Sequence, residues 1–368
     1  MKRISIYAAQ VAFGIYLIWK NMTFRIKKHK IIAVVLPLII IVAAMILLFP
    51  PYSEPDLSAA ETETILIPRG SSLREVANIL DSANVLQWKN VFILEARLSG
   101  YHSQIKAGLF KVPADMHPWH LLKYLTQPSF ADIKVTLPEG ILARDMAAEF
   151  SEKLACDSAR FMALVNDSVY ADSLGVRAGS LEGYLLPETY FSTYGVSEKA
   201  VINRLVGNTL AIFEPDSVQL QLGELNMSRH QVVTLASIIE GEVMVDSERV
   251  IVSSVYHNRL DRGWLLQADP TIQYILPEGP RRLLLKDLEI DSPYNTYRYA
   301  GLPPGPINNP GRGSILAALY PARTSYMYFV ASGDGGHRFS RTAQEHARHK
   351  AQFNRIRREV ARQKANGD

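Results

Sequence analysis

Glu240, an acid near the end of a predicted helix, has the residue type and the setting for proton-transfer chemistry. Ser228 followed by Gln231 is typical of a helix capping box, and apolar residues then recur at helical spacing over positions 232–239. Glu240 continues this apolar stripe, whereas Glu242 is rotated by about 200° onto another face. A carboxyl group that packs against apolar neighbours loses hydration, which suits it to general-acid catalysis. We therefore predict that Glu240 is catalytic; the alternative is a structural ion pair with a basic residue at the helix end.

The residues that follow these acids predict loops suited to sugar binding. After a second helix, predicted from Asp246 to Gly263, the loops Leu266–Tyr274 and Ser292–Tyr297 are dense in amides, hydroxyls and tyrosines. Such side chains bind sugars, because hydroxyl groups pair with planar polar groups and sugar faces pack on aromatic rings. We predict that residues 176–368 form a mixed α+β catalytic domain. The candidate substrate contacts are Glu188, Glu242, Gln267, Asp269, Asn295 and Tyr297.

The C-terminal part of this domain begins with a loop rich in proline and glycine, Gly301–Ser314, which leads into a predicted helix. A helix N-terminus held by a rigid loop can bind a phosphate or a carboxylate. Because the loop has no Walker or dinucleotide fingerprint, we predict that it is an ordered structural loop. A hairpin with strands at Tyr326–Ala331 and His337–Phe339 follows, and a basic helix is predicted from Thr342 onward.

The N-terminal part of the chain predicts a membrane anchor. Ile31 to Phe49 form an uncharged run of 19 residues, which as a helix would measure about 28 Å and match the hydrocarbon core of a bilayer. Basic residues crowd the preceding segment and no acid occurs before Glu54, so the positive-inside rule predicts that residues 1–30 stay in the cytoplasm. We therefore predict one helix, 31–49, in the cytoplasmic (inner) membrane, with the catalytic domain outside the cytoplasm.

Two questions about this anchor stay open in the sequence. The earlier apolar stretch Ile4–Trp19 is shorter and is interrupted by Gln10 and Gly14. It is either a second span or part of a mis-assigned start over residues 1–21, because Met22 opens a conventional basic-then-apolar anchor. A small-residue cleavage site is not evident after the apolar run, so we expect the anchor to be retained.

Charge and cysteine content exclude several classes of protein. Seven of the 40 Lys and Arg residues and none of the 36 acids lie in residues 1–50, which leaves 33 basic against 36 acidic residues beyond the anchor, a net charge of −3. This part has no basic excess for nucleic acid. The single cysteine, Cys156, excludes an internal disulfide framework. His346 and His349 stand three apart, but HExxH is absent, so we predict neither a metal nor a cofactor.

An internal repeat indicates a small α+β module before the catalytic domain. Ile67–Leu80 aligns without gaps on Leu137–Phe150, and each copy predicts a strand, a Pro-x-Gly turn and an amphipathic helix. Two copies are too few for a solenoid. A further strand is predicted at Ala107–Pro113, followed by a helix from Pro118 to Leu125.

The predicted order of strand, helix, helix and strand is similar to the LysM class of glycan-binding modules. We therefore divide the chain into a linker over 50–63, a LysM-like module over 64–130, a second strand–helix unit or connector over 131–175, and the catalytic domain. A structural module without glycan binding is the alternative.

Five ordered motifs carry a resemblance to a known family. LASIIEGE, SSVYHNRL, LQADPTIQY, SPYNTYRYAGLPPGPINNPG and YFVASGDGGHRFSRTAQEH follow a single basic-flanked anchor and resemble the endolytic murein transglycosylase family, MltG or YceG-like. The resemblance extends from the anchor to about Phe353. The catalytic glutamate of the family maps onto Glu240. The family usually has Lys where this chain has Gly241, which leaves the acid in place but predicts altered local charge or an early helix end.

The resemblance implies non-hydrolytic cleavage of the bond between N-acetylmuramic acid and N-acetylglucosamine in peptidoglycan. Glu240 would protonate the leaving oxygen and then accept the proton of the muramoyl 6-hydroxyl, which attacks its own anomeric carbon and leaves a 1,6-anhydro end. The implied partners are glycan strands and the peptidoglycan synthesis machinery. The alternative function is a non-catalytic peptidoglycan-binding protein of cell-wall assembly, for which replacement of Glu240 would leave binding unchanged.

Overall fold

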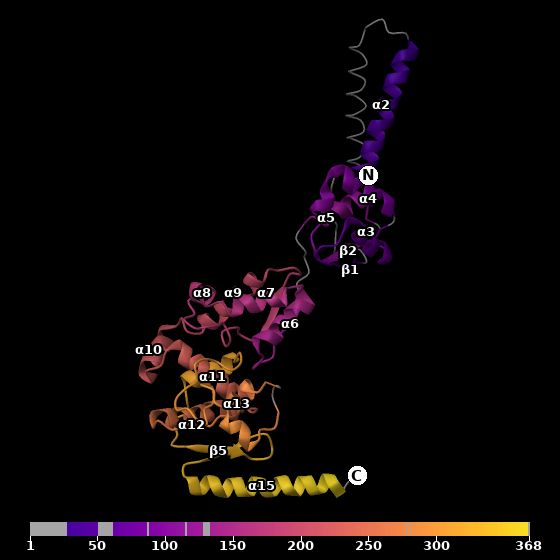
Figure 1. The fold of residues 1–368 in the computed structure, drawn as a ribbon. Helices are drawn as coiled ribbons and strands as arrows, with labels where there is room; N and C mark the ends of the chain where they lie inside the picture. Colours follow the sequence, from indigo (N-terminus) through magenta and orange to yellow (C-terminus); the bar gives the residue numbers. More distant parts are fainter. Residues whose placement is uncertain are drawn as a thin grey trace. The chain divides into compact units, whose positions relative to one another are not determined.

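The computed structural model describes residues 28–50, 62–86, 88–114, 116–127, 133–277, 279 and 281–366 of the chain (Figure 1). The predicted cytoplasmic segment 1–30 and linker 50–63 therefore lie largely outside the described residues. Backbone contacts divide the chain into two compact units. The first comprises Met1–Ile65, Ser71–Lys106 and Lys111–Pro128, and the second comprises Leu66–Gly70, Ala107–Phe110 and Ser129–Asp368.

The apolar run near the N-terminus forms helix α2, Lys28–Leu48, which includes Pro37. Its apolar side chains are largely exposed, with Val34 at 70% and Leu47 at 73% of full exposure. In the part of the chain that the structure describes, no helix reaches the length and hydropathy needed to cross a membrane. The helix itself is thus confirmed, and its insertion into a bilayer stays a prediction.

The first copy of the repeat lies in a small module with two strands. Its elements are β1 (Thr62–Ile67), α3 (Leu73–Ser82), α4 (Lys89–Ser99), η1 (Tyr101–Ser103), β2 (Gly108–Pro113) and α5 (Pro118–Tyr124). Strands β1 and β2 pair in one sheet, and α4 packs against both α3 and α5. The predicted strands and helices are confirmed in this order, whereas glycan binding by the module stays a prediction.

Glu95 is an exception among the apolar side chains that α4 buries. It is fully buried, and among the described residues neither of its carboxylate oxygens has a hydrogen-bond partner. Burial raises the pKa of Glu95 to about 7. Burial in the first unit therefore favours the protonated form of the Glu95 carboxyl group.

The second unit is mostly helical and contains two short antiparallel sheets, β3–β4 and β5–β6. Its elements are β3 (Ile133–Thr136), α6 (Ala143–Leu154), α7 (Ser158–Val165), α8 (Ser168–Ser173), β4 (Thr189–Ser192), α9 (Glu198–Ala211), α10 (Asp216–Leu225), α11 (Arg229–Glu242), η2 (Asp246–Glu248), α12 (Arg249–Asp261), α13 (Asp269–Ile275), η3 (Leu285–Glu289), α14 (Arg312–Leu319), β5 (Tyr328–Ala331), β6 (His337–Ser340) and α15 (Ala343–Asn366). Val135 of β3 is opposite Tyr190 of β4, and both contribute to one hydrophobic core that continues to Leu319. The expected mixed α+β class is confirmed for this unit.

Helix α11 lies at the centre of that core and packs against α12, α13 and α14 (Figure 1). The capping box between Ser228 and Gln231 is present, as predicted. All residues from Val232 to Ile239 are buried, so the helix is covered on every side and not only along one apolar stripe. The last turn of α11 emerges from this core and carries Glu240 and Glu242.

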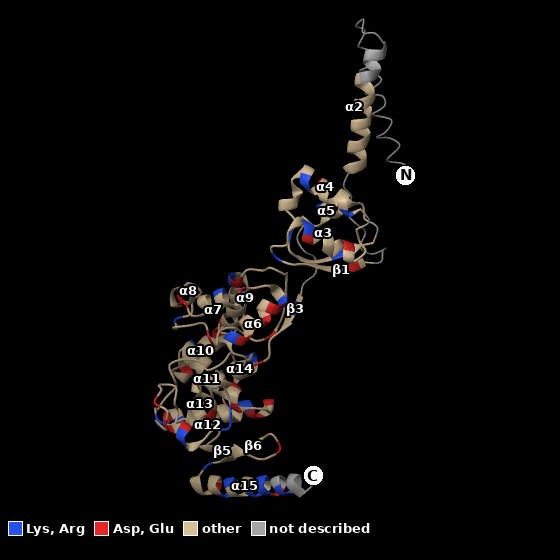
Figure 2. Cartoon of the chain, turned by 45° about the vertical axis from the view of Figure 1, so that its right-hand side comes forward, with Lys and Arg blue, Asp and Glu red and all other residues tan. Residues whose placement is uncertain are grey.

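The C-terminal elements also match their prediction. Strands β5 and β6 form the expected hairpin, with Phe329 opposite Phe339, and α15 packs against both strands. Figure 2 shows that basic residues dominate the surface of α15. The predicted basic helix is therefore confirmed and is anchored to the second unit by the hairpin.

Candidate active site

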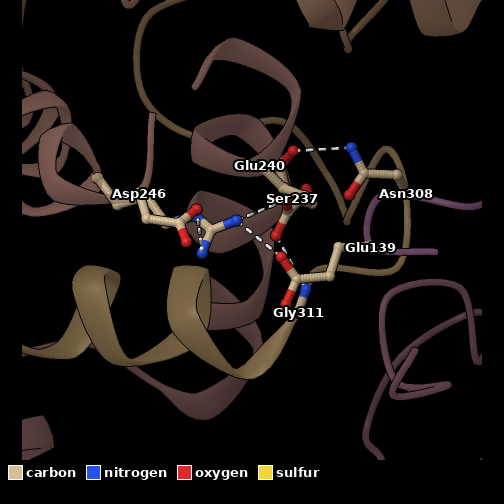
Figure 3. Close-up of polar contacts among 7 residues, drawn as sticks. Glu139, Ser237, Glu240, Asp246, Asn308 and Gly311 are labelled. Atoms are coloured by element: carbon tan, nitrogen blue, oxygen red, sulfur yellow. Dashed lines mark hydrogen bonds and ion pairs between the residues drawn. The ribbon is translucent and has the colours of Figure 1, made fainter. Parts of the chain in front are cut away.

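The carboxyl group of Glu240 is shielded from solvent, but its neighbours are polar (Figure 3). Its side chain is only 6% exposed. The backbone N–H of Gly311 donates a hydrogen bond of 2.9 Å to Oε2, and Nη2 of Arg249 lies 3.4 Å from Oε1. Gly311 is the N-cap of α14, so the positive end of a helix dipole also faces the carboxylate. Both carboxylate oxygens of Glu240 therefore have a partner.

The surroundings of Glu240 thus differ from the apolar edge that the sequence predicted. The ion pair that was the structural alternative is present, with Arg249 at the start of α12 as the basic partner. The loop before α14 does hold a carboxylate at a helix N-terminus, and that carboxylate is Glu240 of the same chain. Both partners approach from segments that the helical pattern of α11 does not contain.

Arg249 is shared by the carboxylates of Glu139, Glu240 and Asp246, which are labelled in Figure 3. The closest contact is Nη2 to Glu139 Oε2 at 2.7 Å, whereas Nη1 lies 3.2 Å from Asp246 Oδ1. The Arg249 side chain is only 13% exposed, and among the described residues its Nε has no hydrogen-bond partner. Glu139 therefore competes with Glu240 for the same cationic group and limits how strongly Arg249 holds Glu240.

Two glycines allow the turn with Glu139 to approach the site. Gly140 has φ +77°, and a Cβ added there would lie 3.5 Å from Cγ of Glu240. A Cβ added to Gly311 would overlap the Glu139 carboxylate. Glycine is thus required at 140 by its positive φ and at 311 by lack of space, and together they bring the Pro138–Gly140 turn next to the N-terminus of α14.

Asn309 fixes the position of this turn. Its backbone C=O accepts the N–H of Gly140 at 2.9 Å, and its Oδ1 accepts two backbone N–H groups of segment 183–185 at 2.8 and 3.1 Å. Its Nδ2 donates to the backbone oxygen of Ile141 at 3.0 Å and to the Glu182 carboxyl group at 2.6 Å. Asn309 is fully buried, and every polar group of its side chain is used. It therefore joins three segments around the turn.

A cavity of about 370 Å³ opens beside the C-terminal end of α11. It extends from Gly140, which lies against Glu240, over Gly241 to the acids Glu242 and Asp269. The remaining wall includes Leu142, Arg144, Pro270, Gln273, Tyr274 and Asn308. Its volume is within the range of small-molecule sites, and its lining combines apolar, aromatic and acidic groups. A larger hollow of about 600 Å³ lies at Tyr326 and Arg341, away from the predicted site residues.

Three of the predicted site residues meet at one end of this cavity. The Tyr256 hydroxyl donates to Glu242 Oε1 at 3.1 Å, and the Tyr297 hydroxyl donates to Asp269 Oδ1 at 2.5 Å. Burial, and then the negative charge of Asp269, raise the pKa of Glu242 to about 7. Glu242, Asp269 and Tyr297 therefore form one connected polar group, in which Glu242 readily holds a proton near neutral pH.

The other predicted contacts are placed differently. Asn295 is fully buried, and its amide bonds to the backbone of Leu288, Ile290 and Tyr297, so it holds its loop. Gln267 is exposed, and its backbone N–H donates to Thr296. Glu188 is exposed at the start of β4 and does not line the cavity. The structure thus does not bring these three side chains to Glu240.

Gly241 does not end the helix early, because α11 continues to Glu242. A Cβ added to Gly241 would lie 2.7 Å from Cβ of Pro270, which is closer than side chains approach each other. Pro270 of α13 therefore leaves no room at position 241 for a side chain such as the Lys that is usual in the family. The lack of a side chain at Gly241 lets α11 and α13 meet at the cavity wall.

Of the two histidines weighed as metal ligands, His349 has a hydrogen-bond partner, whereas Nδ1 of His346 has none among the described residues and its ring stacks on Tyr328. Nδ1 of His337 lies 2.7 Å from Glu248 Oε2, and Nδ1 of His349 lies 2.9 Å from the Ser340 hydroxyl. Within the described ranges, no three His, Cys, Asp or Glu side chains are placed together to hold a metal ion.

Sequence reasoning missed the residues that surround Glu240. Glu139 had a signal, because it stands inside the repeated Pro-x-Gly turn. Asn309 also had one, because two adjacent asparagines interrupt a loop of prolines and glycines. Arg249 had none beyond its place near a helix start. These three side chains act through long-range contacts that a local pattern does not report.

A buried carboxyl group beside a cavity lined by acids and an aromatic side chain is an arrangement typical of enzyme active sites. Residues 65–352 match the YceG-like family, and the chain belongs to this family. It is 32% identical over 308 residues to a protein of Bacillus subtilis (strain 168) named endolytic murein transglycosylase, covering 79% of this chain and 85% of that protein.

Two further relatives agree with this family. A Streptococcus pneumoniae serotype 2 protein, also named endolytic murein transglycosylase, is 27% identical over 335 residues; the match covers 81% of this chain and 59% of that protein. A crystal structure of a YceG-like protein from Listeria monocytogenes superposes with a TM-score of 0.57 at 32% identity, over 78% of this chain and 98% of the other. The similarity thus extends through both units.

Proposed function

We propose that this protein is an endolytic peptidoglycan lytic transglycosylase. It cleaves the bond between N-acetylmuramic acid and N-acetylglucosamine and leaves a 1,6-anhydro-N-acetylmuramic acid end. Membership of the YceG-like family and the names of two relatives support this reaction class. The observation that carries the proposal is the position of Glu240, which is buried at the end of the central helix and lies beside the cavity.

The reaction requires two proton transfers and no water. One proton goes to the leaving glycosidic oxygen, and another leaves the muramoyl 6-hydroxyl as that oxygen bonds to its own anomeric carbon. A water-activating carboxylate, as in inverting glycosidases, is therefore not needed. Gly311 and Arg249 fix the position of the Glu240 carboxyl group, which is the group proposed to transfer these protons.

The cellular setting is also part of the proposal. Exposed apolar side chains along α2, and the basic residues before it, fit a single membrane helix with the N-terminus in the cytoplasm and the catalytic unit outside. From that position the enzyme would cut nascent strands beside the peptidoglycan synthesis machinery. The small N-terminal module would hold the glycan, as its likeness to LysM suggests.

Replacement of Glu240 by Gln tests the proposal. The variant keeps the size of the side chain and an acceptor for Gly311, so we expect it to fold normally. We expect its activity on intact glycan strands to fall by at least about 100-fold, because proton transfer is lost. Mass spectrometry of the digested strands would give the measurement.

The products of the wild-type enzyme separate the possible outcomes. Anhydro ends are expected. Reducing ends would identify a hydrolase and contradict the proposed reaction. Binding to glycan without any cleavage would favour a cell-wall assembly protein that acts without catalysis.

A further inference from the structure

The larger hollow of the second unit, with a volume of about 600 Å³, has no part in the reaction described above. Its lining comes from the residues around the β5–β6 hairpin and from the first two turns of α15. The lining residues are Tyr326, Phe339, Arg341, Glu345, Arg348 and His349. None of them lines the cavity beside α11, so the hollow is a separate surface of the same unit.

Two aromatic rings form an apolar wall of this hollow. The ring centroids of Tyr326 and Phe339 lie 5.6 Å apart, and both side chains are only half-buried. Asn258 of α12 fixes this wall, because its Nδ2 donates a hydrogen bond of 2.9 Å to the backbone oxygen of Tyr326. Partly exposed rings that are held in this way offer a surface on which the apolar face of a sugar can pack.

Two arginines give the hollow a positive charge. The guanidinium of Arg341 lies over the ring of Tyr326, 5.7 Å from its centroid. An arginine that stacks through its planar face keeps its N–H edge available for a carboxylate. Arg348 lines the hollow as well, and within the described ranges neither guanidinium forms an ion pair with a carboxylate. Both cations can therefore pair with an anionic ligand.

The one acid of the hollow is already engaged. Oε2 of Glu345 accepts the backbone N–H of Arg341 at 2.9 Å and that of Thr342 at 3.3 Å, which caps α15. These bonds, together with the charges of Arg348 and Arg341, lower the pKa of Glu345. Two cations thus stand against one acid, and the hollow favours a ligand that combines a ring with a carboxylate.

We propose that this hollow binds a peptide-bearing N-acetylmuramic acid unit of the glycan strand, outside the cavity beside α11. This inference rests on the peptidoglycan substrate of the proposed function. The stem peptides of peptidoglycan are attached to N-acetylmuramic acid and carry free carboxylates. The sugar packs on Tyr326 and Phe339, and a peptide carboxylate pairs with Arg341 and Arg348.

The hairpin connects this hollow to the helix that carries Arg249. Glu248, which directly precedes Arg249, accepts the backbone N–H of His337 at 2.9 Å, and its Oε2 lies 2.7 Å from Nδ1 of the same residue. Strand β6 therefore links the aromatic wall to η2 and the start of α12. A strand bound in the hollow is held by the same packed unit that carries Glu240.

Strand binding by the full-length protein with Glu240→Gln tests the proposal, because the strands then stay intact. Peptide-bearing strands are compared with the same strands after an N-acetylmuramoyl-L-alanine amidase has removed the peptides. We expect fluorescence anisotropy of end-labelled strands to give a Kd about 10-fold lower with peptides than without. Arg341→Gln combined with Arg348→Gln should abolish this difference. It should leave the Kd for peptide-free strands unchanged, which also shows that the fold is intact.

A second pair of arginines on the same helix provides the matched control. Arg357 and Arg358 are exposed on α15 and do not line the hollow. Arg357→Gln combined with Arg358→Gln removes the same charge, and we expect it to keep the preference for peptide-bearing strands. With Glu240 restored, the variant at 341 and 348 should raise KM on peptide-bearing strands about 10-fold and change kcat by less than about 2-fold.

Four results would overturn the inference. These are equal binding of both kinds of strand, a preserved preference in the variant at 341 and 348, and an equal loss in the control variant. The fourth is competition by inorganic phosphate as strong as that by the released stem peptide, which would reduce the hollow to an unspecific anion site. Binding is measured without cleavage, so failure of the wild type to form anhydro ends would contradict the proposed function separately.

Discussion

The two copies of the strand–turn–helix repeat have the same backbone but different surroundings. Both turns contain Pro-x-Gly with a glycine at positive φ, +83° at Gly70 and +77° at Gly140. The residue between proline and glycine is Arg69 in the first copy, where it is exposed. It is Glu139 in the second copy, where it lies 2.7 Å from Arg249, which also contacts Glu240. One turn connects two elements, and the other also forms part of the site.

The helices that follow the turns begin in different ways. Ser72 caps α3 in a capping box with Glu75, so the first copy satisfies its own N-terminus. The aligned residue in the second copy is Leu142, which has no side-chain cap to offer α6. The carboxyl group of Glu182, from a distant segment, serves as the cap instead and accepts a hydrogen bond of 3.1 Å from the backbone N–H of Ala143. The comparison teaches that a repeat becomes part of a site when distant residues take over its local hydrogen bonds.

The largest effect is expected where these distant bonds converge. Asn309→Ala would leave buried N–H groups of segment 183–185 without an acceptor, so we expect the free energy of unfolding to fall by about 3–5 kcal/mol. Native-state hydrogen exchange would measure the loss in α6. Asn78→Ala is the control, because Asn78 is exposed in the first copy. Equal effects of the two variants would contradict the role of Asn309 as the joining residue.

An exchange of charge between the two turns should have an intermediate effect. Glu139→Arg makes the second turn like the first and places a cation beside Arg249, so we expect kcat/KM on glycan strands to fall about 10- to 100-fold. The reciprocal change Arg69→Glu should alter kcat/KM by less than about 2-fold, because Arg69 is exposed. Product quantification for both variants gives the measurement. A similar loss from Arg69→Glu would mean that the first turn also contributes to the site.

A smaller effect concerns one buried acid in each unit. Burial raises the pKa of both Glu95 and Glu182 to about 7 from 4.5, so each contributes stability that is fully present below pH 4.5 and is lost as pH rises through 7. Glu95 has no hydrogen-bond partner among the described residues, so Glu95→Leu should stabilise the first unit by about 1–2 kcal/mol at pH 8. Glu182→Leu should instead destabilise the second unit, because Ala143 and Asn309 lose an acceptor.

Hydrogen exchange across pH would test this pair. The protection factors of α4 amides, which are corrected for the intrinsic pH dependence of exchange, should fall between pH 5 and pH 8 in the wild type, and this fall should disappear in Glu95→Leu. If Glu95→Leu destabilised α4 at pH 8, the buried acid would have a partner that compensates for its burial.

Local sequence patterns predicted the helices and turns that form the site better than they predicted the contacts between them. The capping box at Ser228 located α11, and helical spacing placed Glu240 and Glu242 on different faces. The repeat located both Pro-x-Gly turns. These signals lie within a few residues of one another, so propensity and periodicity report them directly.

The partners of Glu240 could not be predicted in the same way. Asn309 bonds to Gly183 across a separation of 126 residues, and Glu139 meets Arg249 across 110. Such pairs form because packing of the core brings their segments together, and neither sequence segment alone specifies the other. For this reason the sequence left open whether Glu240 has apolar neighbours or a basic partner, and the structure shows the basic partner Arg249.

The absence of a side chain at Gly311 has a consequence for how this family can diverge. A methyl group there would overlap the Glu139 carboxylate, so the two positions are epistatic. A larger residue at 311 would require the Glu139 side chain to turn away or to be shortened, and either change would release Arg249 toward Glu240. We therefore expect the residues at 139 and 311 to change together.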